Sequence, residues 1–192
     1  PNTKILILRN TSLTKLPDLP KLKKLYSCNS NLEKLPELPN CTHIDVCFNN
    51  LRELRHLPKC KTILCEYNKI ESIQNIRKCR KLICNDNKLK TLPSLPNCHI
   101  VNCSNNLLHH VPYLNKCKLL ILKNNPIHKI IINNSCNIQF NGKNTLETLR
   151  FSIIKSVLFH NLLKYNFWYK NNFGEAILPQ KLRSEEHTSE LQ

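Results

Sequence analysis

Apolar residues recur along this chain at a fixed step of 19 residues. Cysteine makes the step easiest to follow, at Cys41, Cys60, Cys79, Cys98, Cys117 and Cys136. The same register extends upstream to Leu22 and Thr3, so seven repeats begin at residues 3, 22, 41, 60, 79, 98 and 117. Several copies in one register are the signature of a repeat architecture, in which each unit stacks on its neighbour.

Each repeat contains a short segment in which apolar and variable positions alternate. The fourth position of the repeats is always apolar, at Leu6, Leu25, Ile44, Ile63, Leu82, Val101 and Leu120. The sixth position is also mostly apolar, whereas the fifth varies. Alternation with a period of two predicts a β-strand. One strand from each repeat, about 4.8 Å from the next, would build a parallel sheet.

Further apolar columns follow at positions eleven, fourteen and seventeen, with Asn at position nine of most repeats. The segments 63–70 and 82–89 show the whole pattern, Leu-x-Cys-x-x-Asn-x-Leu, most closely. This pattern resembles the leucine-rich repeat family over about two thirds of the chain. The resemblance implies a repeat solenoid, an α/β-type horseshoe that is mostly β, with a parallel sheet on its concave face.

The second half of three repeats reads Leu-Pro-x-Leu-Pro, at 16–20, 35–39 and 92–96. Proline lacks an amide hydrogen and biases the residue before it towards extended geometry. We therefore expect an extended, polyproline-like convex side. This short repeat resembles leucine-rich repeat proteins of large DNA viruses, protists or bacteria.

Position nine predicts a structural asparagine ladder. An asparagine side chain both donates and accepts hydrogen bonds, so it can satisfy backbone groups where a strand turns away. Thr11 and Ser30 occupy this position in the first two repeats. The ladder residues are Asn49, Asn68, Asn87, Asn106 and Asn125.

The 11 cysteines fall mainly at the inward positions one and six. Buried free cysteine behaves as a small apolar residue. Neighbouring parallel strands hold Cβ atoms farther apart than the roughly 3.8 Å of a disulfide, and a 19-residue spacing is not a zinc pattern. We therefore expect core thiols, with neither metal nor cofactor. Such a core indicates a reducing compartment, and hence a cytoplasmic location, which is the host cytoplasm if the protein is viral.

The concave face is the predicted binding surface for a protein partner. Its fifth position mixes apolar, aromatic and polar residues, which is typical of an interface rather than of a core or a plain solvated face. The alternative is that a sheet surface merely tolerates β-branched and aromatic residues. With two aromatic residues from position eight, the candidate residues are Tyr26, Asp45, Phe48, Leu64, Tyr67, Ile83, Asn102 and Ile121.

A basic edge is the second candidate surface. The formal net charge is +16, which suits an acidic partner such as nucleic acid. No regular row of aromatic residues accompanies this edge, which disfavours single-stranded nucleic acid, and a Lys-rich solvated surface is the simpler interpretation. The edge consists of Lys21, Lys23, Lys59, Lys61, Lys78, Arg80, Lys116 and Lys118.

We place the solenoid at 1–135, a degenerate repeat with a helical cap at 136–182, and a tail at 183–192. The apolar columns weaken after about residue 132, since Gln139 and Asn141 fall where apolar residues are expected. A capping-box sequence at 144–147 and helical apolar spacing predict an amphipathic helix over about 145–170. Charged residues interrupt this segment, so we expect no membrane span.

Both ends of the sequence are unusual. The chain begins with Pro1 and contains no Met, and the acidic segment 183–192 resembles a translated sequencing adapter. We therefore expect a non-native tail and a natural protein that extends beyond both ends.

No set of residues typical of catalysis is evident. His109 and His110 fall at variable turn positions, where surface residues are expected. The bacterial effectors that the short repeat resembles carry a ubiquitin-ligase domain with a catalytic cysteine, but no Cys follows Cys136 here. We predict a non-catalytic protein–protein interaction scaffold without a small-molecule substrate. Nucleic-acid binding and the substrate-recognition arm of a larger ligase are the alternatives, the latter by analogy of fold alone.

Overall fold

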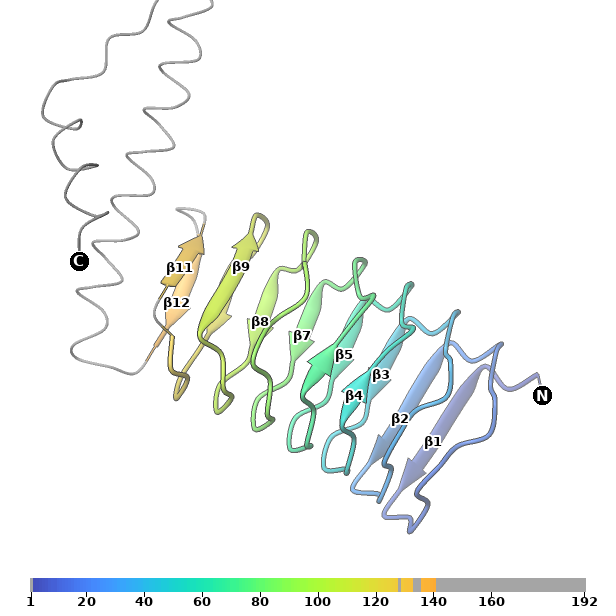
Figure 1. Ribbon diagram of the computed structural model, residues 1–192. Coiled ribbons are helices and arrows are strands. Elements are labelled where there is room, and N and C mark those ends of the chain that lie inside the picture. Colours follow the sequence, from blue (N-terminus) through green and yellow to red (C-terminus); the bar gives the residue numbers. More distant parts are fainter. Residues whose placement is uncertain (1, 128, 133–135, 141–192) are drawn as a thin grey trace, which may run out of the picture. The chain divides into compact units, whose positions relative to one another are not determined.

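The computed structural model describes residues 2–127, 129–132 and 136–140. One parallel sheet of eight strands runs through them in sequence order (Figure 1). Its strands are β1 (Ile5–Arg9), β2 (Lys24–Cys28), β3 (His43–Asp45), β5 (Thr62–Leu64), β7 (Lys81–Ile83), β8 (Ile100–Asn102), β10 (Leu119–Ile121) and β12 (Asn137–Gln139). This arrangement confirms the predicted solenoid with one strand in each repeat.

The 19-residue register holds from β1 to β10. Leu25 of β2 lies opposite Ile44 of β3, and Leu82 of β7 lies opposite Val101 of β8. From the second repeat onwards, the fourth and sixth positions are buried, while the fifth is half-buried. The period-two pattern of the sequence therefore becomes an inner, apolar face and an outer face of the sheet.

The convex side is extended, as the prolines predict. Two short parallel pairs form there: β4 (Glu53–Leu54) with β6 (Ser72–Ile73), and β9 (His110–Leu114) with β11 (Lys129–Ile132). No helix occurs in the described part of the chain. A tight turn then leads into the next strand; in one repeat the Cys41 amide donates to the Leu38 carbonyl at 3.1 Å.

The eighth strand corrects one detail of the sequence register. Leu120 pairs with Ile138, a step of 18 residues rather than 19. Ile138 and Phe140 consequently take the inward positions and pack against the core, while Gln139 lies opposite Ile121 on the outer face. A one-residue deletion therefore explains why Gln139 seemed to interrupt an apolar column.

Position-nine asparagines bridge successive repeats through backbone hydrogen bonds. Asn87, for example, donates to the carbonyls of Cys65, Cys84 and Asn85 at 3.0–3.2 Å and accepts from the Ile70 amide at 2.8 Å. The same pattern recurs at the other four asparagines. In the first two repeats, the Thr11 hydroxyl instead donates to the Ser30 hydroxyl at 3.0 Å.

All 11 cysteines are free thiols. The five buried ones at position one donate to a backbone carbonyl two residues onward, as Cys60 does to Thr62 at 3.2 Å. Burial raises the pKa of the Cys60 thiol to about 12, so it stays neutral and acts as a weak donor in an apolar setting. Two cysteines do not lie at the expected inward positions. Cys28 and Cys47 occupy position seven, on the outer face.

Three predictions fall outside the described residues: the helix over 145–170 with its capping box, the cap that it would form, and the tail at 183–192. In the part that is described, no helix is long and apolar enough to cross a membrane.

Candidate binding surface

The fifth position of each repeat forms a continuous strip on the outer face of the sheet, which is the face predicted to be concave. Tyr26 lies opposite Asp45, and Asp45 opposite Leu64. The strip continues in register through three further strands, at Ile83, Asn102 and Ile121. All six side chains are half-buried, in contrast to their fully buried neighbours at positions four and six.

Position eight lies in the turn after each strand, and its backbone is left-handed in all seven repeats. The φ angle there is between 52° and 57°. Asn and Asp enter this region readily, whereas bulky residues rarely do. Five repeats carry Asn or Asp at this position, and the exceptions are Phe48 and Tyr67.

These two aromatic residues stack on each other across neighbouring repeats. Their ring centroids are 4.4 Å apart with an interplanar angle of 8°, and their exposed fractions are 53% and 48%. The sequence named both residues but not their stacking. The available signal was that every other residue of their column is Asn or Asp, the types suited to a left-handed turn.

Amide hydrogen bonds join position eight elsewhere along the solenoid. Asn29 donates to Asn10, Asn105 to Asp86, and Asn124 to Asn105, each at 2.7 Å. This outer ladder was not predicted from the sequence. Stacking of Phe48 on Tyr67 takes the place of such a hydrogen bond in the middle of the row.

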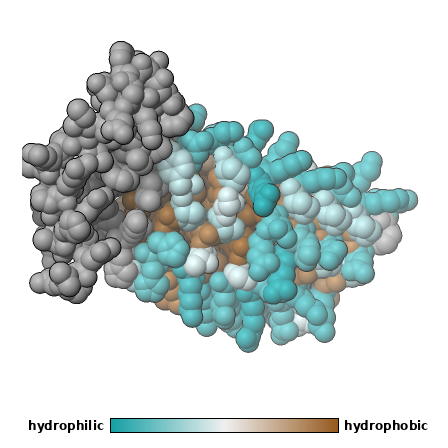
Figure 2. Space-filling view, turned by 45° about the horizontal axis from the view of Figure 1, so that its top comes forward, coloured by the Kyte–Doolittle hydropathy of each residue, from teal (hydrophilic) through white to brown (hydrophobic). Residues whose placement is uncertain are grey.

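The eight residues of the basic edge are all exposed. Three of the lysines donate to an asparagine in the preceding repeat: Lys21 to Asn2, Lys59 to Asn40, and Lys116 to Asn97, at 2.7–3.0 Å. Neither ion pair found among the described residues involves this edge. Figure 2 shows one face of the molecule on which hydrophilic side chains cover most of the surface, with apolar side chains visible between them.

Two solved structures share this arrangement of strands. YopM from Yersinia enterocolitica WA-314 matches with a TM-score of 0.57 and 23% identity, over 68% of this chain and 35% of that one. YopM from Yersinia pestis, a leucine-rich effector protein, matches with a TM-score of 0.58 and 26% identity, over 76% of this chain and 47% of that one. The chain is a leucine-rich repeat solenoid.

The leucine-rich repeat assignment rests on the repeat and its fold. No model of a known protein family matches the sequence, and no curated protein matches it. The chain spans less than half the length of each YopM chain that it matches.

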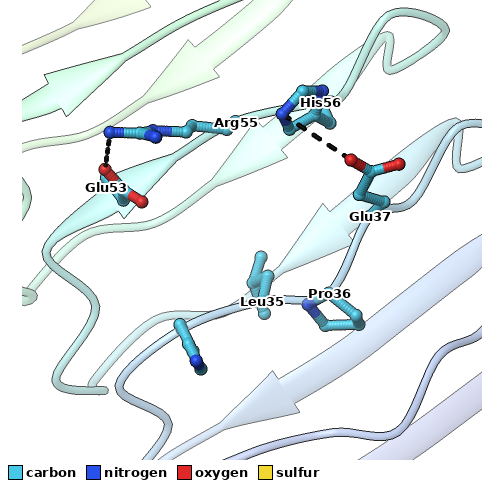
Figure 3. Close-up of a pocket in the computed structure, with 7 residues that line it drawn as sticks. Leu35, Pro36, Glu37, Glu53, Arg55 and His56 are labelled. Carbon is cyan, nitrogen blue, oxygen red and sulfur yellow. Dashed lines mark ion pairs between the residues drawn. The ribbon is translucent and has the colours of Figure 1, made fainter.

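A small pocket lies on the convex side of the leucine-rich repeat solenoid (Figure 3). Glu53 and Arg55 form an ion pair at one wall. Nε2 of His56 lies 3.8 Å from Oε1 of Glu37. The pocket holds about 140 Å³, which is less than the roughly 300–1,000 Å³ of pockets that enclose small ligands. Its residues are Lys34, Leu35, Pro36, Glu37, Glu53, Arg55 and His56.

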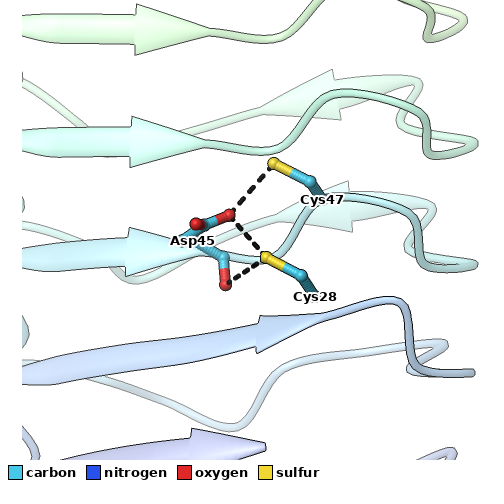
Figure 4. A group of neighbouring side chains, drawn as sticks. All are labelled: Cys28, Asp45 and Cys47. Carbon is cyan, nitrogen blue, oxygen red and sulfur yellow. Dashed lines mark hydrogen bonds between the residues drawn. The ribbon is translucent and has the colours of Figure 1, made fainter. Parts of the chain in front are cut away.

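The concave face of this leucine-rich repeat protein also carries a cluster that the sequence did not reveal. The side chains of Cys28, Asp45 and Cys47 meet there, with their ligand atoms all within 4.8 Å of one another (Figure 4). Position seven shares its face with position five because side chains alternate along a strand. Reading these two columns together would have placed the three residues side by side.

Proposed function

We propose that this chain is a non-catalytic scaffold that binds a protein partner on its concave face, with the Phe48–Tyr67 stack at the centre of the contact. The single observation that carries the proposal is the left-handed backbone of these two exposed aromatic residues. Such a conformation destabilises a bulky residue by about 1–2 kcal/mol. Asparagine would avoid this penalty, and other repeats contain it.

The surroundings of the stack support an interface. Leu64 and Ile83 lie opposite each other on neighbouring strands of the position-five strip, where they add half-buried apolar side chains to the same face of the sheet. Asp45 and Asp86 supply charge at the border of this area. Aromatic residues at the centre of such a surface commonly dominate binding energy, and a polar border is typical of protein interfaces.

A reducing compartment fits this protein, because its 11 cysteines are free thiols. We therefore place its binding activity in a cytoplasm, which would be that of a host cell if the chain is of viral origin.

The test replaces both aromatic residues by the residue type that their column prefers. Phe48→Asn together with Tyr67→Asn should keep the fold, because Asn suits the left-handed turn. Tyr113→Asn is the matched control, since it removes an aromatic side chain of similar exposure, 56%, from the convex strand β9.

Wild-type and variant chains would be used to capture proteins from nuclease-treated cell lysate, with identification by mass spectrometry. We expect a protein that binds the wild type and the Tyr113→Asn control but not the double variant. Equal capture by all three chains would refute a binding site at the aromatic stack.

A second candidate function is binding of nucleic acid or another acidic partner along the basic edge. The observation in its favour is that asparagines hold Lys21, Lys59 and Lys116 along the edge without neutralising them. Binding of this kind weakens steeply as salt rises. The test measures retention of radiolabelled nucleic acid by the chain. Retention that is lost when these three lysines become Gln, but is unchanged by Phe48→Asn, would favour binding along the basic edge.

A further inference from the structure

Two thiols and a carboxylate converge where strands β2 and β3 end. Cys28 is the last residue of β2, Asp45 is the last of β3, and Cys47 follows two positions later. Both thiols donate to the same atom, Oδ1 of Asp45, at 2.8 Å from Cys28 and 3.0 Å from Cys47 (Figure 4). Three potential metal ligands therefore point at one another from two adjacent repeats.

A fourth potential ligand lies in the next repeat, outside the group of three. Glu66 occupies position seven of the repeat after that of Cys47, near enough to contribute to the raised pKa of the Cys47 thiol. Its Oε2 atom is buried and has no hydrogen-bond partner among the described residues. A buried carboxylate oxygen without a partner is costly, and coordination to a cation would satisfy it.

We propose that Cys28, Asp45, Cys47 and Glu66 form a zinc-binding site on the concave face, joining the second, third and fourth repeats. Two thiolates and two carboxylates suit Zn²⁺, which accepts both sulfur and oxygen in tetrahedral sites. Their summed charge of about −4 equals that of a four-cysteine structural zinc site.

Only a small movement would convert the hydrogen-bonded cluster into a coordination sphere. Zinc–sulfur bonds of about 2.3 Å and zinc–oxygen bonds of about 2.0–2.2 Å place tetrahedral ligands roughly 3.5–3.8 Å apart. The thiol and carboxylate atoms are now 2.8 and 3.0 Å apart. These two thiol–carboxylate pairs therefore need to separate by less than about 1 Å, which side-chain rotation can supply. Glu66 lies outside the group of three whose ligand atoms are within 4.8 Å of one another, so its side chain would have to move towards the other three.

Metal binding would replace two protons. Burial, followed by interactions with Asp45, raises the pKa of the Cys28 thiol to about 11. Burial also raises the pKa of Cys47, with further contributions from Glu66 and Asp45. Both thiols are therefore protonated without metal at neutral pH, and one Zn²⁺ entering the site releases two protons to solvent.

The cluster differs from every other pair of position-five and position-seven residues. The next repeats carry Ile83 with Asn85, and Asn102 with Ser104, neither of which offers thiolate or carboxylate ligands. The other nine cysteines occupy different positions; those buried at position one donate to backbone carbonyls, as do Cys65 and Cys103 at position six. The site is therefore confined to a single place along the solenoid.

The test measures zinc bound to the full chain, purified in a phosphine reductant and freed of metal by a chelator. Zinc content after gel filtration gives the stoichiometry, and competition with a chromophoric chelator gives the affinity. We expect one zinc per chain, and a sulfur-to-metal charge-transfer band when Co²⁺ replaces zinc. Unfolding temperature should also rise with added zinc.

Two variants and one control make the result specific. Cys28→Ser should weaken zinc binding about 100-fold or more, and the milder Asp45→Asn at least about tenfold. Cys136→Ser, a half-buried cysteine outside the cluster, should bind zinc as the wild type does. Circular dichroism verifies folding, and Asp45→Asn keeps the test valid if Cys28→Ser does not fold.

Three outcomes would overturn the proposal. They are a wild-type chain that binds no zinc, both variants with unchanged affinity, and a Cys28–Cys47 disulfide in place of the metal.

Discussion

The second to fourth repeats and the fifth to seventh share one backbone but present different surfaces. In the later repeats, position eight is a row of Asp86, Asn105 and Asn124, joined by amide hydrogen bonds. In the earlier repeats the same turn holds the stacked Phe48 and Tyr67, and the thiol–carboxylate cluster lies directly before them. The inward columns therefore maintain the solenoid, while the outer columns are free to acquire function.

The largest expected effect is a difference in stability loss between alanine substitutions on the inner and the outer face of one strand. Ile63 is fully buried in β5, whereas its neighbour Leu64 is half-buried on the outer face. Ile63→Ala should lower the free energy of unfolding by about 2–5 kcal/mol because it leaves a cavity. Leu64→Ala should lower it by about 1 kcal/mol or less. Urea unfolding measures both, and equal losses would contradict the assignment of faces.

The asparagine ladder should distinguish the later repeats from the first two. Asn87→Ala removes a side chain that makes four hydrogen bonds to backbone groups, so we expect a loss of about 2–3 kcal/mol. Ser30→Ala removes a hydroxyl with fewer bonds, and its loss should be about 1 kcal/mol or less. Urea unfolding measures both losses. An equal loss of unfolding free energy in the two variants would contradict the larger structural role of the asparagine.

Ser27 offers a way to make the second repeat more like the fourth. It is fully buried at inward position six, and its hydroxyl has no hydrogen-bond partner among the described residues. Cysteine occupies that position in three later repeats. Ser27→Cys should therefore raise the free energy of unfolding by about 1 kcal/mol. A loss of stability would show that the hydroxyl is satisfied in solution.

Thiol reactivity should show the smallest effect. The pKa of Cys28 is raised to about 11, so the reactive thiolate fraction at neutral pH is small and grows about tenfold with each pH unit below that value. In metal-free protein, alkylation of Cys28 followed by mass spectrometry should accelerate accordingly from pH 7 to 9. A rate independent of pH would contradict a raised pKa.

The sequence predicted the fold well because positions four and six lie on the inner face of the sheet in every repeat. Leu25, Ile44 and Leu82 are all buried where alternation put them. The error at Gln139 arose because a one-residue deletion shifts every side chain to the opposite face, which a fixed step of 19 cannot accommodate.

The proposed binding surface was harder to predict from the sequence. Phe48 and Tyr67 stack only because position eight is left-handed, and that conformation became evident from φ angles rather than from apolar spacing. The Cys28–Asp45–Cys47 cluster was missed because its members come from two columns of different composition. Columns that vary in residue type carry little periodic signal, and both proposed sites lie in those columns.

The affinity of a captured protein partner for three chains tests the central claim most directly. These are the wild type, the Phe48→Asn/Tyr67→Asn double variant, and the Tyr113→Asn control, compared by calorimetry. The double variant should remain folded, with its stability within about 1 kcal/mol of the wild type, because relief of the left-handed strain offsets the lost stacking. Its binding should be at least about 100-fold weaker, while the control binds normally. Unchanged affinity in the double variant would contradict a concave-face site centred on the aromatic stack.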